Sequence, residues 1–132
     1  MSREVSTNGR KKVSTLMKEF NANFPYIYIY VCTPDSKALV QNGKAVNGVD
    51  FEKTLSEVRT KKGDGEISFT GSKNVKTIEK EFENIFGLYV QICYTSNDGN
   101  KYYTSGSDDN KSLSQLNREK GADGCLKGRW KG

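Results

Sequence analysis

Hydrophobic and polar residues alternate in one short stretch of the chain and then change to a helical spacing. The segment EISFT, residues 66–70, alternates Ile67 and Phe69 with polar neighbours, which predicts a strand with one buried face. Gly71 follows this strand. Apolar residues then recur every three or four positions, as one face of an amphipathic helix requires: Val75, Ile78, Phe82, Ile85 and Phe86. The pattern predicts a strand and then a helix that stops at Gly87.

The same pattern occurs earlier in the chain. Residues 4–33 align with residues 66–95 without a gap, and 11 of the 30 positions are identical. A second match pairs residues 44–63 with residues 102–121, after a loop that is four residues longer in the first half. This self-similarity predicts a tandem duplication of a unit of about sixty residues.

Each unit contains a second strand, a turn and a second helix. The dipeptides Asn42-Gly43 and Asp98-Gly99 favour hairpin turns, and spaced aliphatic residues near 55–58 and 113–116 predict short helices. The unit is thus β-α-β-β-α. We expect an α+β fold in which two such units form one mixed, largely antiparallel sheet with helices mainly on one face. The layering is analogous to ferredoxin-like folds and to the TATA-binding fold, and residues 1–132 form one compact domain of two repeats, 1–63 and 64–132.

The segment FPYIYIYVC places tyrosines on one side of a strand and Ile27, Ile29 and Val31 on the other. The gap-free alignment sets the tyrosines against Leu88, Val90 and Ile92, which predicts that the tyrosines face the helices. The aliphatic stripe then lies on the other face of the sheet. Together with Tyr89 and Trp130 it is the candidate interaction surface, covered by the C-terminal tail, by a second copy of the chain or by a protein partner.

The opposite orientation of this strand supports a different function. Outward tyrosines on an open sheet can stack nucleic-acid bases, and the basic N-terminal segment would contact phosphates. The candidate anion or nucleic-acid contacts are Arg10, Lys11, Lys12 and Lys73. Lys11 and Lys73 occupy matching turns between a strand and a helix. Each turn either serves only to reverse the chain or holds an anion at the helix start.

Composition narrows the classes of function. The net charge is +5, which fits an ordinary solvated surface or a modest attraction to phosphates. Histidine is absent, so imidazole-based catalysis is excluded, and the carboxylates of Asp108, Asp109 and the 79–83 segment fit solvated surface positions. We expect a non-enzymatic binding or protein-interaction module without a cofactor.

The three cysteines also bear on the environment of the protein. They include no CxxC pair and their number is odd, so we expect free, buried thiols rather than disulfides or a metal site. No apolar run is long enough to span a membrane, and the first residues do not resemble a secretory signal. These features indicate a cytoplasmic protein that either forms a homodimer or binds a protein partner, with single-stranded RNA or DNA as the alternative ligand.

Overall fold

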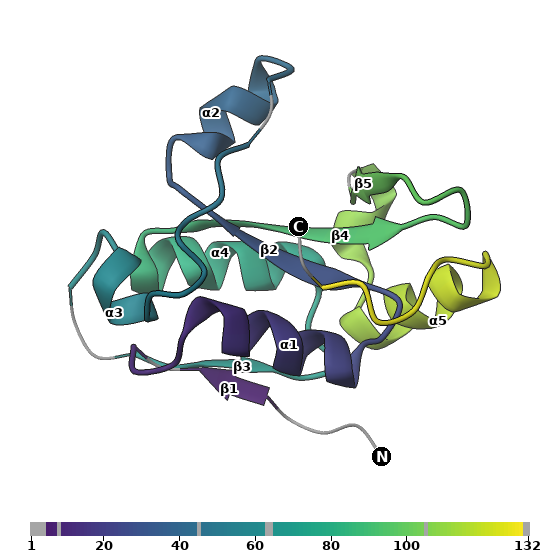
Figure 1. Cartoon of the computed structure of the whole chain (residues 1–132), viewed down its shortest axis with the longest axis horizontal. Helices are drawn as coiled ribbons and strands as arrows, with labels where there is room; N and C mark the ends of the chain where they lie inside the picture. The colour runs from purple at the N-terminus through teal and green to yellow at the C-terminus, as the bar shows by residue number, and fades with distance from the viewer. Residues whose placement is uncertain (1–4, 8, 45, 63–64, 105, 131–132) are drawn as a thin grey trace.

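The computed structural model describes residues 5–7, 9–44, 46–62, 65–104 and 106–130 (Figure 1). Its strands are β1 (Val5–Thr7), β2 (Tyr28–Cys32), β3 (Ile67–Phe69), β4 (Tyr89–Thr95) and β5 (Lys101–Tyr103). Its α-helices are α1 (Val13–Asn23), α2 (Ser36–Gln41), α3 (Leu55–Val58), α4 (Val75–Phe86) and α5 (Leu113–Ala122), and a short 3-10 helix, η1, spans Gly106–Asn110. The α+β class predicted from the sequence is confirmed.

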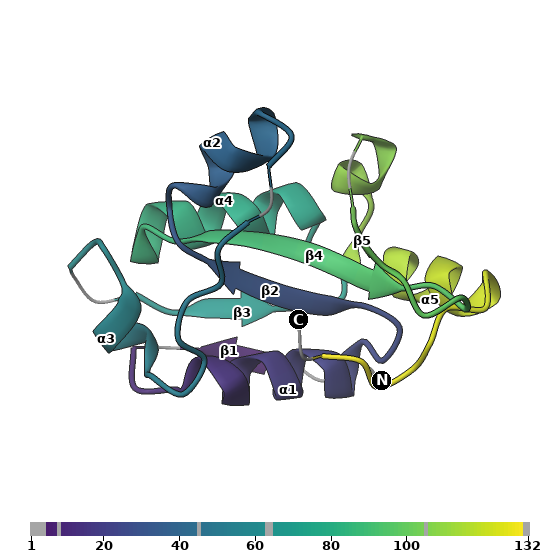
Figure 2. The ribbon, with the colours of Figure 1, turned by 45° about the horizontal axis from the view of Figure 1, so that its top comes forward.

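The described strands form two separate antiparallel sheets. β1 pairs with β3, and the larger sheet has the order β2-β4-β5. Figures 1 and 2 show the two sheets on opposite sides of the molecule, with α1 and α4 flanking the space between them. The prediction of one mixed sheet is therefore wrong for the described residues, because the first strand of each half pairs only with its counterpart.

The hydrophobic core lies between the two sheets. Both α1 and α4 contact both sheets, since each helix is apolar on the side that faces them. Phe69 of β3 joins the two helices: its ring meets Phe20 of α1 edge-on at 5.4 Å and stacks on Phe82 of α4 at 5.9 Å, measured between ring centroids. One aromatic cluster thus connects the two halves of the chain.

β2 presents its aliphatic residues to the helices, which is the reverse of the prediction. Ile27, Ile29 and Val31 are completely buried in the core. The register pairs Ile29 with Ile92 and Val31 with Val90, so the aliphatic residues of both strands share one face. The prediction that these three residues belong to an exposed interaction surface is therefore wrong.

The gap-free alignment fails between the helix and the strand. Three positions separate the buried Phe24 from Ile27, the first core residue that leads into β2, whereas two separate Phe86 from Leu88. Because side chains alternate along a strand, a shift of one residue exchanges its two faces. The extra residue in the first half turns the tyrosines of β2 away from the helices.

The described residues of the first half also lack the predicted hairpin. Helix α2 stands between β2 and the segment that returns to it, and Asn42-Gly43 ends this helix instead of forming a two-residue turn. Gly43 has a φ of 70°, the left-handed conformation common after a helix. Among the described residues, the backbone of the returning chain pairs with β2 through one isolated antiparallel bridge, between Cys32 and Gly48. In the second half, Asp98-Gly99 does form the turn between β4 and β5, as predicted.

The three cysteines are free and buried, as predicted. Cys32 and Cys93 lie in adjacent strands, and Cys125 follows α5. Beyond Cys125 the chain passes between the end of β4 and the turn before β2, where the amide of Leu126 donates to the Thr95 carbonyl at 2.8 Å and the amide of Gly128 donates to the Pro25 carbonyl at 2.9 Å. These bonds attach the C-terminal segment to the sheet.

Candidate ligand-binding face

The face of the β2-β4-β5 sheet that points away from α1 and α4, here called the outer face, carries an aromatic row. In the register of the three strands, Tyr28 lies opposite Cys93, and Cys93 lies opposite Tyr103. Tyr30 lies opposite Gln91 in the next row on the same face. The sequence pattern explains this arrangement, since every second residue of each strand belongs to this face.

Tyrosines and one lysine form a shallow pocket on this outer face. Tyr28, Tyr30, Tyr103 and Lys101 line a hollow of about 120 Å³. Tyr28 is only 3% exposed and makes the floor, whereas Tyr103 is 49% exposed and makes a wall. A hollow of this size admits one flat ring or a short side chain rather than a whole ligand.

A glycine allows Tyr30 to reach its position. A Cβ atom on Gly48 would lie 2.6 Å from the Tyr30 hydroxyl oxygen, so only glycine lets the chain pass this close to the ring. The ring of Phe51 meets Tyr30 edge-on, with 5.6 Å between the centroids. The segment that returns from α2 thereby holds Tyr30 in place on the outer face.

The tyrosines and the buried thiols of the outer face are uncharged at neutral pH. Burial raises the pKa of the Cys32 thiol to about 12, and burial is also the main cause that raises the pKa values of Cys93, Tyr28 and Tyr30. Burial, with the charge of Glu79 as a smaller cause, raises the pKa of Tyr89 to about 12. The face therefore offers neutral hydroxyls and aromatic rings beside the charge of Lys101, and its thiols are poor nucleophiles.

The predicted anion contacts lie elsewhere. Lys11 and Lys73 precede α1 and α4, and each contacts a carboxylate of its own helix: Lys11 Nζ is 2.6 Å from Glu19 Oε1, and Lys73 Nζ is 2.8 Å from Glu81 Oε1. These lysines neutralise helix carboxylates. This favours the interpretation that both turns serve only to reverse the chain. Arg10 and Lys12 belong to the first turn, beside α3 and at the opposite end of the molecule from β5 (Figure 1).

The five residues of the predicted interaction surface do not share one face. Ile27, Ile29 and Val31 are in the core, whereas Tyr89 lies on the outer face and is partly exposed. Trp130 packs against the core from the C-terminal segment, with Lys18 Nζ 5.6 Å from the centre of its ring. Trp130 thus holds the end of the described chain against α1.

Sequence reasoning missed Lys101 and Tyr103. The only signal for them is the alternation in KYYT after the turn at Asp98-Gly99, which places Lys101 and Tyr103 on one face and Tyr102 on the other. Their importance depends on the orientation of β2, because Tyr28 and Tyr30 complete the pocket. With β2 assigned to the wrong face, these residues could not be grouped.

A second hollow, of about 360 Å³, separates α2 from α4 and contains Glu79, Tyr89 and three lysines, Lys37, Lys76 and Lys80. Burial first, and the nearby charge of Asp109 second, raise the pKa of Glu79 to about 7. The sequence predicted a solvated carboxylate here, so the partial burial of Glu79 is a correction. No group of three or more metal-ligating side chains converges within the described ranges.

Comparison with known proteins supplies no relative: no protein-family model, curated protein or solved structure matches the chain. Within the described part of the chain, none of the helices has the length and apolar character needed to cross a membrane.

Proposed function

We propose that this protein is a non-enzymatic binding module that takes single-stranded nucleic acid on its outer face. One observation carries the proposal: Tyr28, Tyr30 and Tyr103 line one pocket with Lys101 on the sheet face that no core helix covers. Proteins that bind single strands combine aromatic side chains, on which bases stack, with cations that contact the backbone.

The chemistry of the pocket fits this ligand class. Tyr103 is exposed enough for a base to lie against its ring, and burial keeps the neighbouring Tyr28 and Tyr30 neutral. Lys101 supplies a positive charge for a phosphate. High pKa values at Cys32 and Cys93 argue against a nucleophile on this face, which supports binding rather than catalysis.

We also infer that the chain is one domain built from two copies of one unit, residues 1–63 and 64–132. Contacts at the helix starts support this inference, because Lys12 bridges Thr54 in the first half as Asn74 bridges Ser112 in the second. The amide of Ser56 donates to the Gly9 carbonyl as that of Ser114 donates to Gly71. Repeated backbone contacts at matched sequence positions are what duplication produces.

The test uses two neighbouring tyrosines of β5 that face opposite ways. Tyr103 lines the pocket, whereas Tyr102 stacks on Tyr94 on the other face of the strand and is similarly exposed, at 42%. We expect fluorescence anisotropy to show binding of a labelled single-stranded RNA or DNA at low salt. Since stacking contributes about 1–3 kcal/mol per base, Tyr103→Ala should weaken binding about tenfold, and Tyr102→Ala should leave it nearly unchanged.

Three results would contradict this proposal. The first is the absence of binding at low salt, where phosphate contacts are strongest. The second is an equal loss in the Tyr102 and Tyr103 variants, because only Tyr103 belongs to the pocket. Binding that persists unchanged in Tyr103→Ala would place the ligand on another surface.

Self-association is a second candidate, supported by the edge of the sheet. β5 pairs only with β4 among the described strands, and its three residues are exposed, so its free edge can add a strand from another chain. Light scattering decides between monomer and dimer. A dimer that persists at high salt supports strand addition at β5, and a monomer at every concentration rejects it.

A further inference from the structure

We propose that the cavity between the β4-β5 hairpin and the C-terminal segment binds a phosphate group. The cavity has a volume of about 330 Å³ and is lined by Thr95, Gly99, Lys101, Leu126, Gly128, Arg129 and Trp130. It differs from the shallow pocket lined by Tyr28, Tyr30, Tyr103 and Lys101, here called the tyrosine pocket. The two share Lys101 alone. The inference stands on its own observations and does not rest on nucleic-acid binding.

The first observation is a buried hydroxyl without a partner. Thr95 is only 4% exposed, and its Oγ1 atom has no hydrogen-bond partner among the described residues. The backbone carbonyl of Thr95 accepts from Leu126, so only the side chain is unsatisfied. A buried hydroxyl without a partner is costly and uncommon in native proteins. A ligand oxygen in the cavity would accept the Thr95 hydrogen bond and remove this cost.

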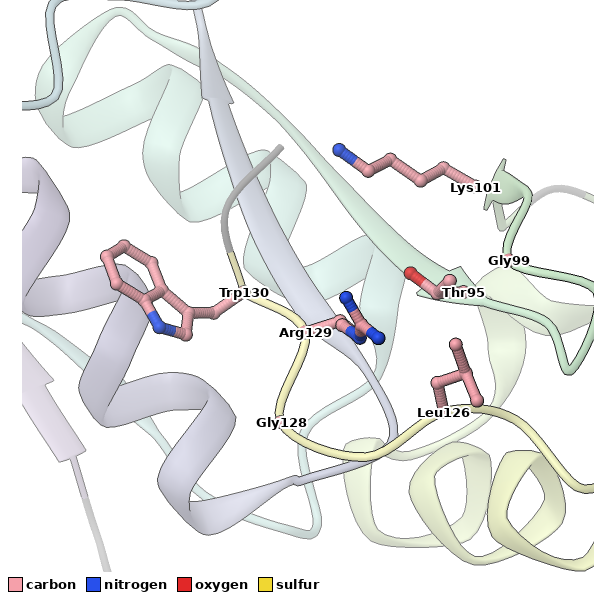
Figure 3. Close-up of a pocket in the computed structure, with 7 residues that line it drawn as sticks. All are labelled: Thr95, Gly99, Lys101, Leu126, Gly128, Arg129 and Trp130. Carbon is pink, nitrogen blue, oxygen red and sulfur yellow. The ribbon is translucent and has the colours of Figure 1, made fainter.

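The second observation is the convergence of two cations on the same cavity. Figure 3 shows the ammonium group of Lys101 and the guanidinium of Arg129 on either side of the space that the Thr95 hydroxyl faces. Lys101 comes from β5 and Arg129 from the C-terminal segment, so the fold brings together residues distant in the sequence. A guanidinium fork beside an ammonium group is a good match for phosphate oxygens.

The third observation is the sign of the charge around the cavity. None of the described lining residues is acidic. The nearest acidic residue along the chain, Asp98, is turned into its own hairpin turn, where the Asn100 amide donates to Asp98 Oδ1 at 2.9 Å and Asn100 Nδ2 lies 3.2 Å from Oδ2. Hydrogen bonds from Ser96 and Asn100 lower the pKa of Asp98 and keep it there. The cavity therefore keeps its positive character.

The size of the cavity indicates a phosphate that is part of a larger molecule. Leu126 and Trp130 supply an apolar part of the wall, beside which a sugar or another carbon group attached to the phosphate can pack. Gly128 has a φ of 76°, which turns the chain immediately before Arg129. The ligand chemistry is a phosphate ester, either a small phosphorylated molecule or one phosphate of a nucleic-acid backbone.

The test is a titration of the isotope-labelled full chain with inorganic phosphate, followed by NMR, with sodium chloride at matched ionic strength as the reference. We expect saturable shifts of the amide signals of Thr95, Leu126 and Arg129. Arg129→Gln should weaken phosphate binding at least about fivefold, because it removes a charge-assisted hydrogen-bonding pair. Lys127→Gln is the matched control, since Lys127 is exposed on the same segment and does not line the cavity.

Thr95→Val gives a second readout that a purely structural role would not produce. The variant keeps the shape of the side chain and removes the unsatisfied hydroxyl. We expect a higher melting temperature than the parent protein in phosphate-free buffer, together with a smaller rise in melting temperature when phosphate is added. A lower melting temperature without phosphate and an unchanged response to phosphate would overturn the role of Thr95.

The outcomes separate this site from the tyrosine pocket. The absence of saturable shifts, or an equal loss in Lys127→Gln, would overturn the proposal, because the effect would then be general electrostatic attraction. If phosphate displaces a bound oligonucleotide, the cavity takes a backbone phosphate; if both bind together, it takes a small phosphate ester. If no oligonucleotide binds at all, the phosphate titration still decides whether the cavity is a site.

Discussion

At the scale of single residues, Glu79 has an unusual environment for a carboxylate. It lies on α4, partly buried beside Tyr89, and its pKa is raised from 4.5 to about 7 by burial first and by Asp109 second. A carboxyl group with a raised pKa is held more readily in its neutral form by the folded chain than by the unfolded chain. Its contribution to stability is therefore complete below pH 4.5 and is lost as the pH rises through 7.

This direction gives a prediction for Glu79→Gln, which is neutral at every pH. The variant should match the parent below pH 4.5 and be more stable above pH 7, by on the order of 1–2 kcal/mol after allowance for solvent screening. Urea unfolding at both ends of this range measures the difference. Glu83→Gln, an exposed position on the same helix, is the control and should retain the parent's pH dependence. If the free energies of unfolding of Glu79→Gln and the parent change with pH in parallel, the raised pKa of Glu79 is contradicted.

At the scale of secondary structure, three helix starts share the same kind of lysine–glutamate ion pair. A lysine two residues before the helix contacts a glutamate eight residues later in three cases: Lys11 with Glu19, Lys73 with Glu81 and Lys111 with Glu119. The fourth such lysine, Lys53, is followed at this spacing by Lys61, and its helix, α3, has only four residues. There a capping box between Thr54 and Glu57 stabilises the helix start instead.

Thr54→Ala should therefore destabilise the protein by about 1 kcal/mol, because it removes the hydrogen bond to the Glu57 amide at the start of α3. Ser112 caps α5 in the same way through the Gln115 amide, so Ser112→Ala should have a similar effect. Thermal unfolding measures both variants. Thr77→Ala is the control, since Thr77 is exposed within α4 and away from its start. No loss of stability in either cap variant would argue against these caps.

Most of the elements were predictable from the sequence, whereas the orientation of β2 was not. Helical spacing placed α1 and α4, and alternation placed β3, because periodicity follows from local geometry. The faces of β2 depend on one extra residue before the strand, which an ungapped alignment cannot detect. A shift of one residue pairs Tyr28 with Tyr89 and Cys32 with Cys93, and those two identities were the available signal.

The segment after β2 shows a second limit. Asn42-Gly43 fits both a hairpin turn and a helix end, and the preceding SKALVQ contains only one β-branched residue, so the choice depends on contacts elsewhere in the fold. The cavity that we propose to bind phosphate could not be predicted from the sequence, for a similar reason. Thr95, Lys101 and Arg129 carry no common motif, and only the attachment of the C-terminal segment to β4 brings them together.

At the scale of the whole molecule, the two halves share one core. Phe69 of the second half packs between α1 and α4, and the central pair of strands, β2 and β4, joins the halves along five residue pairs. Neither half can bury its apolar surface alone. The chain should therefore unfold in one cooperative transition.

This sharing predicts the behaviour of fragments. Residues 1–63 alone and residues 64–132 alone should be largely unfolded by circular dichroism, because each exposes the apolar face that packs on the other half. An equimolar mixture should regain helical signal, with a melting temperature that rises with concentration. Phe69→Ala in the second fragment should weaken this reassembly, since the variant leaves a cavity between two helices that costs about 3–5 kcal/mol. A folded, stable single fragment would contradict the shared core.

The three buried cysteines can report where the structure opens locally. Cys32 and Cys93 are covered within the central sheet, whereas Cys125 stands where the C-terminal segment leaves α5. Burial raises the pKa of all three thiols, so a thiol-modifying reagent reaches them in reactive form only when the surrounding structure opens. Modification of Cys125 before the other two would time the release of the C-terminal segment, and modification of Cys32 and Cys93 together would time the opening of the sheet.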